Sequence, residues 1–167
     1  MDARRESEPT PVKNNTTVER KSEREFVVTR TFNGPVRLVF EAWTKPELFK
    51  RWWAPKSTGV PLLSCEMDVR VGGMYRLVFG HDASETSAFF GRYIEVTPHS
   101  RLVWTNEEGG GEAITTVTFE EKGGKTLLVL HELHPSKEAV DDAIGFGDGL
   151  RETFEQLDEL LVTLGAS

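Results

Sequence analysis

The chain has 167 residues and a formal net charge of -7, with 38% of the residues hydrophobic and 28% charged. This length and balance predict one globular domain in water. The negative charge argues against nucleic acid or an anionic membrane surface as a partner, because both would repel it. The single cysteine, Cys65, excludes an intrachain disulfide and agrees with a reducing compartment. No apolar run reaches the roughly 18 residues of a membrane span, and the N-terminus lacks a signal-peptide segment. The sequence therefore predicts a cytoplasmic protein without membrane insertion.

Residues 1–24 hold almost no large apolar side chain, and their basic and acidic groups nearly cancel. With so little apolar surface to offset the entropy lost on ordering, this segment is predicted to be a disordered N-terminal tail. The folded domain is then expected to span residues 25–167.

A strand followed by two short helices begins this domain. Residues 25–33 alternate and are rich in β-forming side chains, which predicts the strand. Asn33-Gly34 turns the chain, and Pro35 suits the first position of a helix with an apolar stripe. Pro46 suits the start of a second short helix, and Ala54-Pro55 ends it.

The chain from Pro61 to Glu132 consists of strands and turns. The predicted strands span residues 61–69, 73–79, 87–97, 101–106, 113–121 and 126–132. Because the connections between consecutive strands are short, the pattern predicts an antiparallel meander.

A long amphipathic helix is predicted from Ser136 to Leu164. Ser136 follows a proline and suits the N-cap, and Gly165 suits the end. Three glycines lie in residues 145–149, where each costs about 1 kcal/mol relative to alanine in a helix interior. We expect a pliable segment there, or the close approach of another group. The apolar stripe consists of Ala139, Ala143, Phe146, Leu150, Phe154, Leu157, Leu161 and Leu164.

The predicted fold class is α+β. One amphipathic helix can cover one face of a sheet of about seven strands if the sheet curls around that helix. Beside this order of elements, the chain contains a set of short motifs: Pro35-Val36, Phe40-Glu41-Ala42-Trp43, Thr44, Pro46-Glu47-Leu48, Trp52-Trp53 with Pro55, Asp68 to Gly73, Gly91, Glu95 to Pro98, Arg101 to Trp104, and Gly149 with Leu157. In these motifs and in the order of its elements the chain resembles the START-like, helix-grip (SRPBCC) superfamily, and within it the branch named for the activator of Hsp90 ATPase.

The resemblance implies an apolar cavity between the curled sheet and the long helix, occupied by a small hydrophobic or aromatic molecule. The sixteen aromatic residues of the chain agree with such a pocket. Branch members usually carry tryptophan where this chain has Leu150, which implies a larger or differently shaped cavity. The residues expected to contact the ligand are Trp52, Trp53, Tyr75, Leu77, Phe79, Phe89, Tyr93, Trp104, Phe119, Leu128, Phe146 and Leu150.

The mouth of this cavity is expected between the loop with Trp52, Trp53 and Pro55 and the glycine-rich part of the last helix. A pliable helix beside large aromatic side chains suits a gate. Alternatively, the tryptophans hold the second short helix on the sheet. The sequence leaves both roles open.

No pattern in the sequence names a catalytic residue, a cofactor or a metal site. His131 and His134 lie three residues apart on a predicted strand, so their imidazoles should point to opposite faces rather than share a metal ion. Cys65 has no local partner, and no nucleophile motif or phosphate-binding loop is present. Glu41 and Glu66 are candidates for buried acids, which could serve as an acid or base.

Three functions therefore stay open on the sequence alone. They are binding of a small apolar molecule, an enzyme of the cyclase or hydrolase type in the same cavity, and an Hsp90-related or other protein-interaction module. Because a fold does not fix function, the first rests largely on the resemblance. A homodimer is also open, since Leu127 and Val129 could form an apolar strip on the outer face of the sheet.

Overall fold

Eight antiparallel strands form one sheet with the order β1-β2-β8-β7-β6-β5-β4-β3. The computed structural model describes residues 16–82, 84–107 and 112–165, except for the side chains of residues 146–148. The strands are β1 Thr17–Ser22, β2 Glu25–Phe32, β3 Leu62–Met67, β4 Met74–Asp82, β5 Glu85–Thr97, β6 Arg101–Asn106, β7 Ala113–Lys122 and β8 Lys125–Leu133. The helices are α1 Val36–Thr44, α2 Pro46–Phe49, the 3-10 helix η1 Lys56–Thr58 and α3 Lys137–Thr163.

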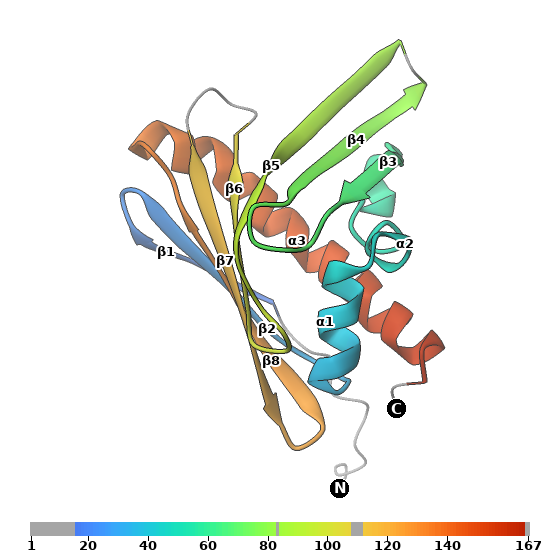
Figure 1. The fold of residues 1–167 in the computed structure, drawn as a ribbon. Coiled ribbons are helices and arrows are strands. Elements are labelled where there is room, and N and C mark those ends of the chain that lie inside the picture. The colour runs from blue at the N-terminus through green and yellow to red at the C-terminus, as the bar shows by residue number, and fades with distance from the viewer. Residues whose placement is uncertain (1–15, 83, 108–111, 166–167) are drawn as a thin grey trace, which may run out of the picture.

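The sheet curves around α3, which crosses its concave side, while α1 and α2 cover one end of that side (Figure 1). The hairpin of β4 and β5 extends beyond the other strands (Figure 1). This arrangement is the α+β helix-grip fold, so the predicted fold class is confirmed. None of the helices in the described part of the chain is long and apolar enough to cross a membrane.

The prediction that residues 1–24 form a disordered tail is wrong for residues 17–22. Residues 17–22 form β1, which pairs with β2 in an antiparallel register. Most of its side chains are exposed, so its stability comes from backbone hydrogen bonds and ion pairs rather than from apolar burial. One such pair joins Arg20 Nη1 to Asp141 Oδ1 of α3 at 2.6 Å. Residues 1–15 lie outside the described residues.

Helix α3 begins and ends close to the predicted bounds, because the N-cap residue Ser136 is recognisable in the sequence. The Ser136 hydroxyl accepts a hydrogen bond from the backbone N–H of Ala139 at 3.1 Å, which satisfies one of the free N–H groups of the first turn. In the second half of the helix, Phe154, Leu157 and Leu161 of the predicted stripe are completely buried. Pro35 differs slightly from its prediction, since it is the N-cap of α1 rather than its first helical residue.

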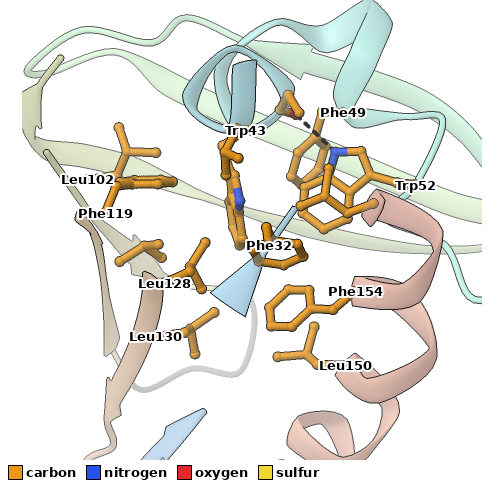
Figure 2. Close-up of a cluster of buried hydrophobic side chains, with 14 of the residues drawn as sticks. Phe32, Trp43, Phe49, Trp52, Leu102, Phe119, Leu128, Leu130, Leu150 and Phe154 are labelled. Atoms are coloured by element: carbon orange, nitrogen blue, oxygen red, sulfur yellow. Dashed lines mark hydrogen bonds between the residues drawn. The ribbon is translucent and has the colours of Figure 1, made fainter. Parts of the chain in front are cut away.

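An aromatic cluster centred on Trp43 fills the end of the concave face beneath α1 and α2. The Trp43 ring lies 4.9 Å from that of Trp52 and 6.2 Å from that of Phe154 of α3, measured between ring centres. Trp43 stands between side chains of the sheet, including Phe119, and side chains of the helices (Figure 2). The indole N–H of Trp52 donates to the carbonyl of Ala42 at 3.0 Å. Trp52 therefore fastens the segment after α2 to α1.

The segment after Trp52 is held on α3 by one amide side chain. Gln156 donates from Nε2 to the carbonyl oxygens of Trp52 and Ala54, both at 3.0 Å. Its Oε1 accepts from the backbone N–H of Lys56 at 2.9 Å. Three hydrogen bonds from one buried side chain place this loop beside the middle of α3.

A buried arginine attaches α3 to the end of the sheet formed by β1 and β2. Arg30 of β2 has only 3% of its side chain exposed, and its Nη2 donates to Asp158 Oδ2 at 2.8 Å. Its Nη1 donates to the hydroxyl of Thr16 at 2.8 Å. Asp158 Oδ1 also accepts from the backbone N–H of Asn33 at 3.1 Å. A buried guanidinium needs such partners, because desolvating an unpaired charge costs several kcal/mol.

The apolar strip proposed for a homodimer is less open than the sequence suggested. Leu127 and Val129 lie in β8 between β2 and β7, opposite Thr31 and Thr29 of β2. Both side chains are partly buried.

The Arg30 contact predicts the effect of removing its carboxylate. Asp158→Ala should lower the free energy of unfolding by about 3 kcal/mol, because it leaves a buried guanidinium without its counter-ion. Urea denaturation measures this loss. Glu159→Ala, at the exposed neighbouring position, is the control and should change stability by less than about 0.5 kcal/mol. Equal losses in the two variants would show that the Arg30 contact does not hold α3.

Candidate functional site

A cavity of about 850 Å³ lies between α3 and the concave face of the sheet. It adjoins the Trp43 cluster, and its walls come from β4, β5, β6, β8, the first two-thirds of α3 and the segment after α2. Most of the lining is apolar and much of it aromatic. The lining includes seven of the residues expected to contact a ligand, namely Trp53, Tyr75, Leu77, Phe79, Phe89, Tyr93 and Trp104.

Four other expected residues lie in the core rather than in the cavity lining: Trp52, Phe119, Leu128 and Leu150. Phe119 faces the concave side as its parity predicts, but α1 covers it, with the ring of Phe40 at 5.3 Å. Trp52 is turned into the core by its bond to Ala42. A side chain that faces the concave side of the sheet can therefore be packed in the core instead of lining the cavity. The side chain of Phe146, the twelfth expected residue, lies outside the described ones.

Trp53, Pro55 and Gly149 all line the cavity, so the loop and the glycine-rich part of α3 meet at it as expected. A Cβ atom added at Gly149 would meet nothing within 4 Å, and the same holds at Gly145. Only Gly149 of these two lines the cavity. Neither glycine is required by a close neighbour, so a Cβ atom fits at both positions.

A row of hydrogen-bonded polar side chains crosses the cavity wall. The Tyr75 hydroxyl donates to the carbonyl of Thr105 at 2.8 Å and lies 3.1 Å from Asn106 Oδ1. Asn106 Nδ2 donates to the hydroxyl of Thr115 at 2.8 Å, and that hydroxyl donates to Glu132 Oε2 at 2.9 Å. We call Tyr75, Asn106, Thr115, Glu132 and His134 the polar row.

The row ends in a buried carboxylate and imidazole. Glu132 Oε1 lies 2.9 Å from His134 Nε2, and the two side chains are only 9% and 10% exposed. The His134 ring stacks on Phe26 at 5.8 Å between ring centres, which fixes its orientation. Glu132 and His134 both line the cavity. A charged carboxylate in such a place needs donors, and Thr115 and His134 are placed to supply them.

A glycine allows the row to cross the sheet. Tyr75 of β4 pairs with Gly91 of β5, and its hydroxyl reaches past that residue to Thr105 of β6. A Cβ atom at Gly91 would lie 1.9 Å from the Thr105 carbonyl oxygen, so no other residue fits without moving the backbone. Gly91 thus permits both the close approach of the strands and the reach of the tyrosine.

Four members of the polar row were not predicted from the sequence as site residues, namely Asn106, Thr115, Glu132 and His134, although the sequence contains a pattern that indicates two of them. Leu128 and Leu130 were expected to face inward, and continuing their alternation by two and four residues reaches Glu132 and His134. His131, with the opposite parity, bonds Glu25 at 2.8 Å on the other face. The expected divergence of the two imidazoles is confirmed. No group of side chains suited to a metal ion is found among the described residues.

Neither Glu41 nor Glu66, the two candidates for buried acids, is fully buried. Glu66 is exposed, and Glu41 is only partly buried and lies 3.9 Å from both Arg37 and Lys45. Glu66 pairs with Arg76 in the register of two strands near the sheet edge, so its side chain faces water rather than the cavity. The buried acid of the described residues that lines the cavity is Glu132.

Two further groups are held neutral by burial. Burial raises the pKa of the Tyr93 hydroxyl, and the negative charge of the Asp68 carboxylate adds a smaller effect in the same direction, so the phenol of this lining residue keeps its proton. Burial also raises the pKa of the Cys65 thiol to about 11, while the charge of Lys50 opposes this shift more weakly. Cys65 is therefore a poor nucleophile.

The Cys65 pKa predicts slow alkylation. A thiol with a pKa of about 11 holds far less thiolate at pH 7 than an ordinary cysteine, so iodoacetamide should react at least about a hundredfold more slowly than with the urea-unfolded chain. The rate should rise about tenfold per pH unit between pH 7 and 10. Mass spectrometry of timed samples measures both. Equal rates in the folded and unfolded chains would contradict the burial of the thiol.

Two glycines should respond to alanine in opposite ways. Gly91→Ala should lower the free energy of unfolding by about 3 kcal/mol, because its methyl group overlaps the backbone of Thr105. Gly145→Ala should raise it by about 0.5–1 kcal/mol, since α3 gains helix propensity and the methyl group meets no neighbour. Thermal and urea unfolding of the two variants test this contrast. A neutral Gly91→Ala change would argue against the close strand approach.

Solved structures share this fold over nearly their whole length. A crystal structure of a protein from Rhodobacter sphaeroides matches with a TM-score of 0.81 and 23% identity, covering 89% of this chain and 99% of that one. One from Nitrosomonas europaea matches with a TM-score of 0.76 and 26% identity, covering 88% and 99%. A solution structure from Staphylococcus epidermidis matches with a TM-score of 0.71 and 27% identity, covering 88% and 94%.

A search of curated proteins finds no match. The family model described as Activator of Hsp90 ATPase homolog 1-like protein matches residues 33–162, which include both short helices, the strands from β3 to β8, the cavity lining and nearly all of α3. The chain therefore belongs to the family of Activator of Hsp90 ATPase homolog 1-like proteins.

Proposed function

We propose that this protein binds a small hydrophobic or aromatic molecule in the cavity between the sheet and α3. The observation that carries the proposal is the cavity itself. Its volume of about 850 Å³ falls within the range of roughly 300–1,000 Å³ usual for ligand pockets. Its lining is mostly apolar and aromatic, with a few polar groups gathered on one wall, which is the usual composition of such pockets.

The walls suit binding because most of them are held in place without a ligand. Trp43 is fixed by several ring contacts, and Tyr75 by its bonds to β6. The loop with Trp53 is fastened to α3 through Gln156. A preformed site loses little conformational entropy when a ligand enters, so more of the burial free energy becomes affinity.

The catalytic alternative has less support. A hydrolase or cyclase requires groups that attack the substrate or transfer a proton at a defined position. The Cys65 thiol is buried and protonated, and it does not line the cavity. The carboxylate of Glu132 is held in place by Thr115 and His134, and its remaining acceptor capacity suits the binding of a ligand group. Binding without turnover requires none of these groups to react.

The test is a titration with N-phenyl-1-naphthylamine, an uncharged dye that becomes fluorescent in apolar surroundings. We expect saturable binding with one site per chain, and a rise of several degrees in the melting temperature at 100 times the Kd, from about 2.7 kcal/mol of added stability. Gly149→Leu should weaken binding at least tenfold, because the new side chain enters the cavity.

The matched control is Gly145→Leu on the same helix. It adds the same side chain at a glycine with equally open surroundings that does not line the cavity, so its affinity should equal that of the unaltered chain. Absence of saturable binding, or equal losses in the two variants, would contradict the proposal.

A further inference from the structure

The polar row places its only full negative charge at the cavity wall. Glu132 Oε2 accepts from Thr115 and Oε1 is bonded to His134, which accounts for one bond to each carboxylate oxygen. A carboxylate oxygen can accept two hydrogen bonds. The acid therefore keeps acceptor capacity for a group that enters the cavity, and it lines that cavity.

A donor lies beside this acceptor. Asn106 lines the cavity and donates one Nδ2 hydrogen to Thr115, so the second hydrogen on that nitrogen has no partner among the described residues. His134 faces the Glu132 carboxylate with Nε2, so its role at this wall is to hold that carboxylate in place. The wall thus offers both an acceptor and a donor to one ligand group.

The charges of the lining restrict which group this is. Among the described residues, Glu132 and Asp142 are the carboxylates of the lining, and it contains neither lysine nor arginine. A ligand carboxylate would lose its hydration and meet like charge, with no cation to compensate. A ligand hydroxyl carries no charge and both donates and accepts hydrogen bonds, which matches the wall.

We propose that Glu132, with His134 and Asn106 beside it, is a subsite that binds the hydroxyl of an uncharged aromatic ligand and discriminates against carboxylates. This inference rests on the proposed function, because the aromatic body of the ligand would occupy the apolar part of the cavity. Glu132 accepts the hydroxyl hydrogen, while the second Nδ2 hydrogen of Asn106 donates to the hydroxyl oxygen and His134 holds the carboxylate of Glu132 in place. The rest of the row holds the carboxylate in place through Thr115.

The experiment compares four probes that share one ring system: naphthalene, 2-naphthol, 2-naphthoate and 2-naphthylmethylammonium. Each competes at pH 7 against bound N-phenyl-1-naphthylamine on the unaltered protein. We expect 2-naphthol to displace the dye at a concentration at least tenfold lower than naphthalene, and 2-naphthoate to be the weakest competitor. This first comparison needs no variant, so a folding defect cannot obscure it.

A pair of variants then assigns the effect to one residue. Glu132→Gln keeps the size of the side chain and removes its charge, so both the advantage of 2-naphthol and the penalty on 2-naphthoate should shrink by about tenfold. Glu120→Gln removes the same charge from an exposed position outside the cavity lining, and should leave all four affinities as they were. Circular dichroism checks that both variants are folded.

The possible failures are distinct. If the dye binds and 2-naphthol competes no better than naphthalene, or if 2-naphthoate or the ammonium probe competes best, the subsite is wrong while the proposed cavity function stands. Equal effects of the two glutamine variants also overturn the role of Glu132. If the dye itself does not bind saturably, the proposed function fails, and the subsite fails with it.

Discussion

The packing of Trp43 is the interaction on which the rest of this structure depends. Its ring, which α1 carries, contacts side chains from the segment after α2, from the sheet and from α3. It thereby joins every layer of the fold at one end of the concave face, and Figure 2 shows it between the two walls of that end. Because this end is filled, the sheet can stay apart from α3 at the other end. The cavity is the space that remains, and Trp43 itself forms part of its boundary.

The division of the concave face into a filled end and an open end explains why polar side chains can be buried in the interior. At the filled end the buried groups are almost all apolar, whereas the open end contains the polar row, each member of which is bonded to the next. A connected row avoids the cost of unpaired polar groups, which is several kcal/mol for a charged one. Arg30 of β2 and Asp158 of α3 follow the same rule. Among the described residues, these two groups and Glu132 with His134 are thus buried as neighbouring pairs.

Much of the fold could be predicted from the sequence, because its signals are local. The cap at Ser136, the apolar stripe of α3 and the alternation of β8 each depend on residues a few positions apart. Strand β1 was missed because it contributes little apolar surface, and its stability comes from β2 and from α3, which are distant in the chain. Trp52 and Trp53 also show that local sequence patterns do not predict tertiary contacts. Adjacent in sequence, one lies in the core and the other in the cavity wall, and only tertiary contacts separate them. The polar row required knowing which strands are neighbours, which no local pattern contains.

The pairing of β1 and β2 bears on how this protein can be shortened. The family model begins at residue 33, yet both strands lie before that point. Removing them would leave β8 as a new edge of the sheet, with a full row of N–H and C=O groups open to other chains. Such an edge is a template for strand addition between molecules and thus for aggregation. The first two strands thus cover the edge of β8, and β2 also places Phe26, Val28 and Phe32 in the apolar core.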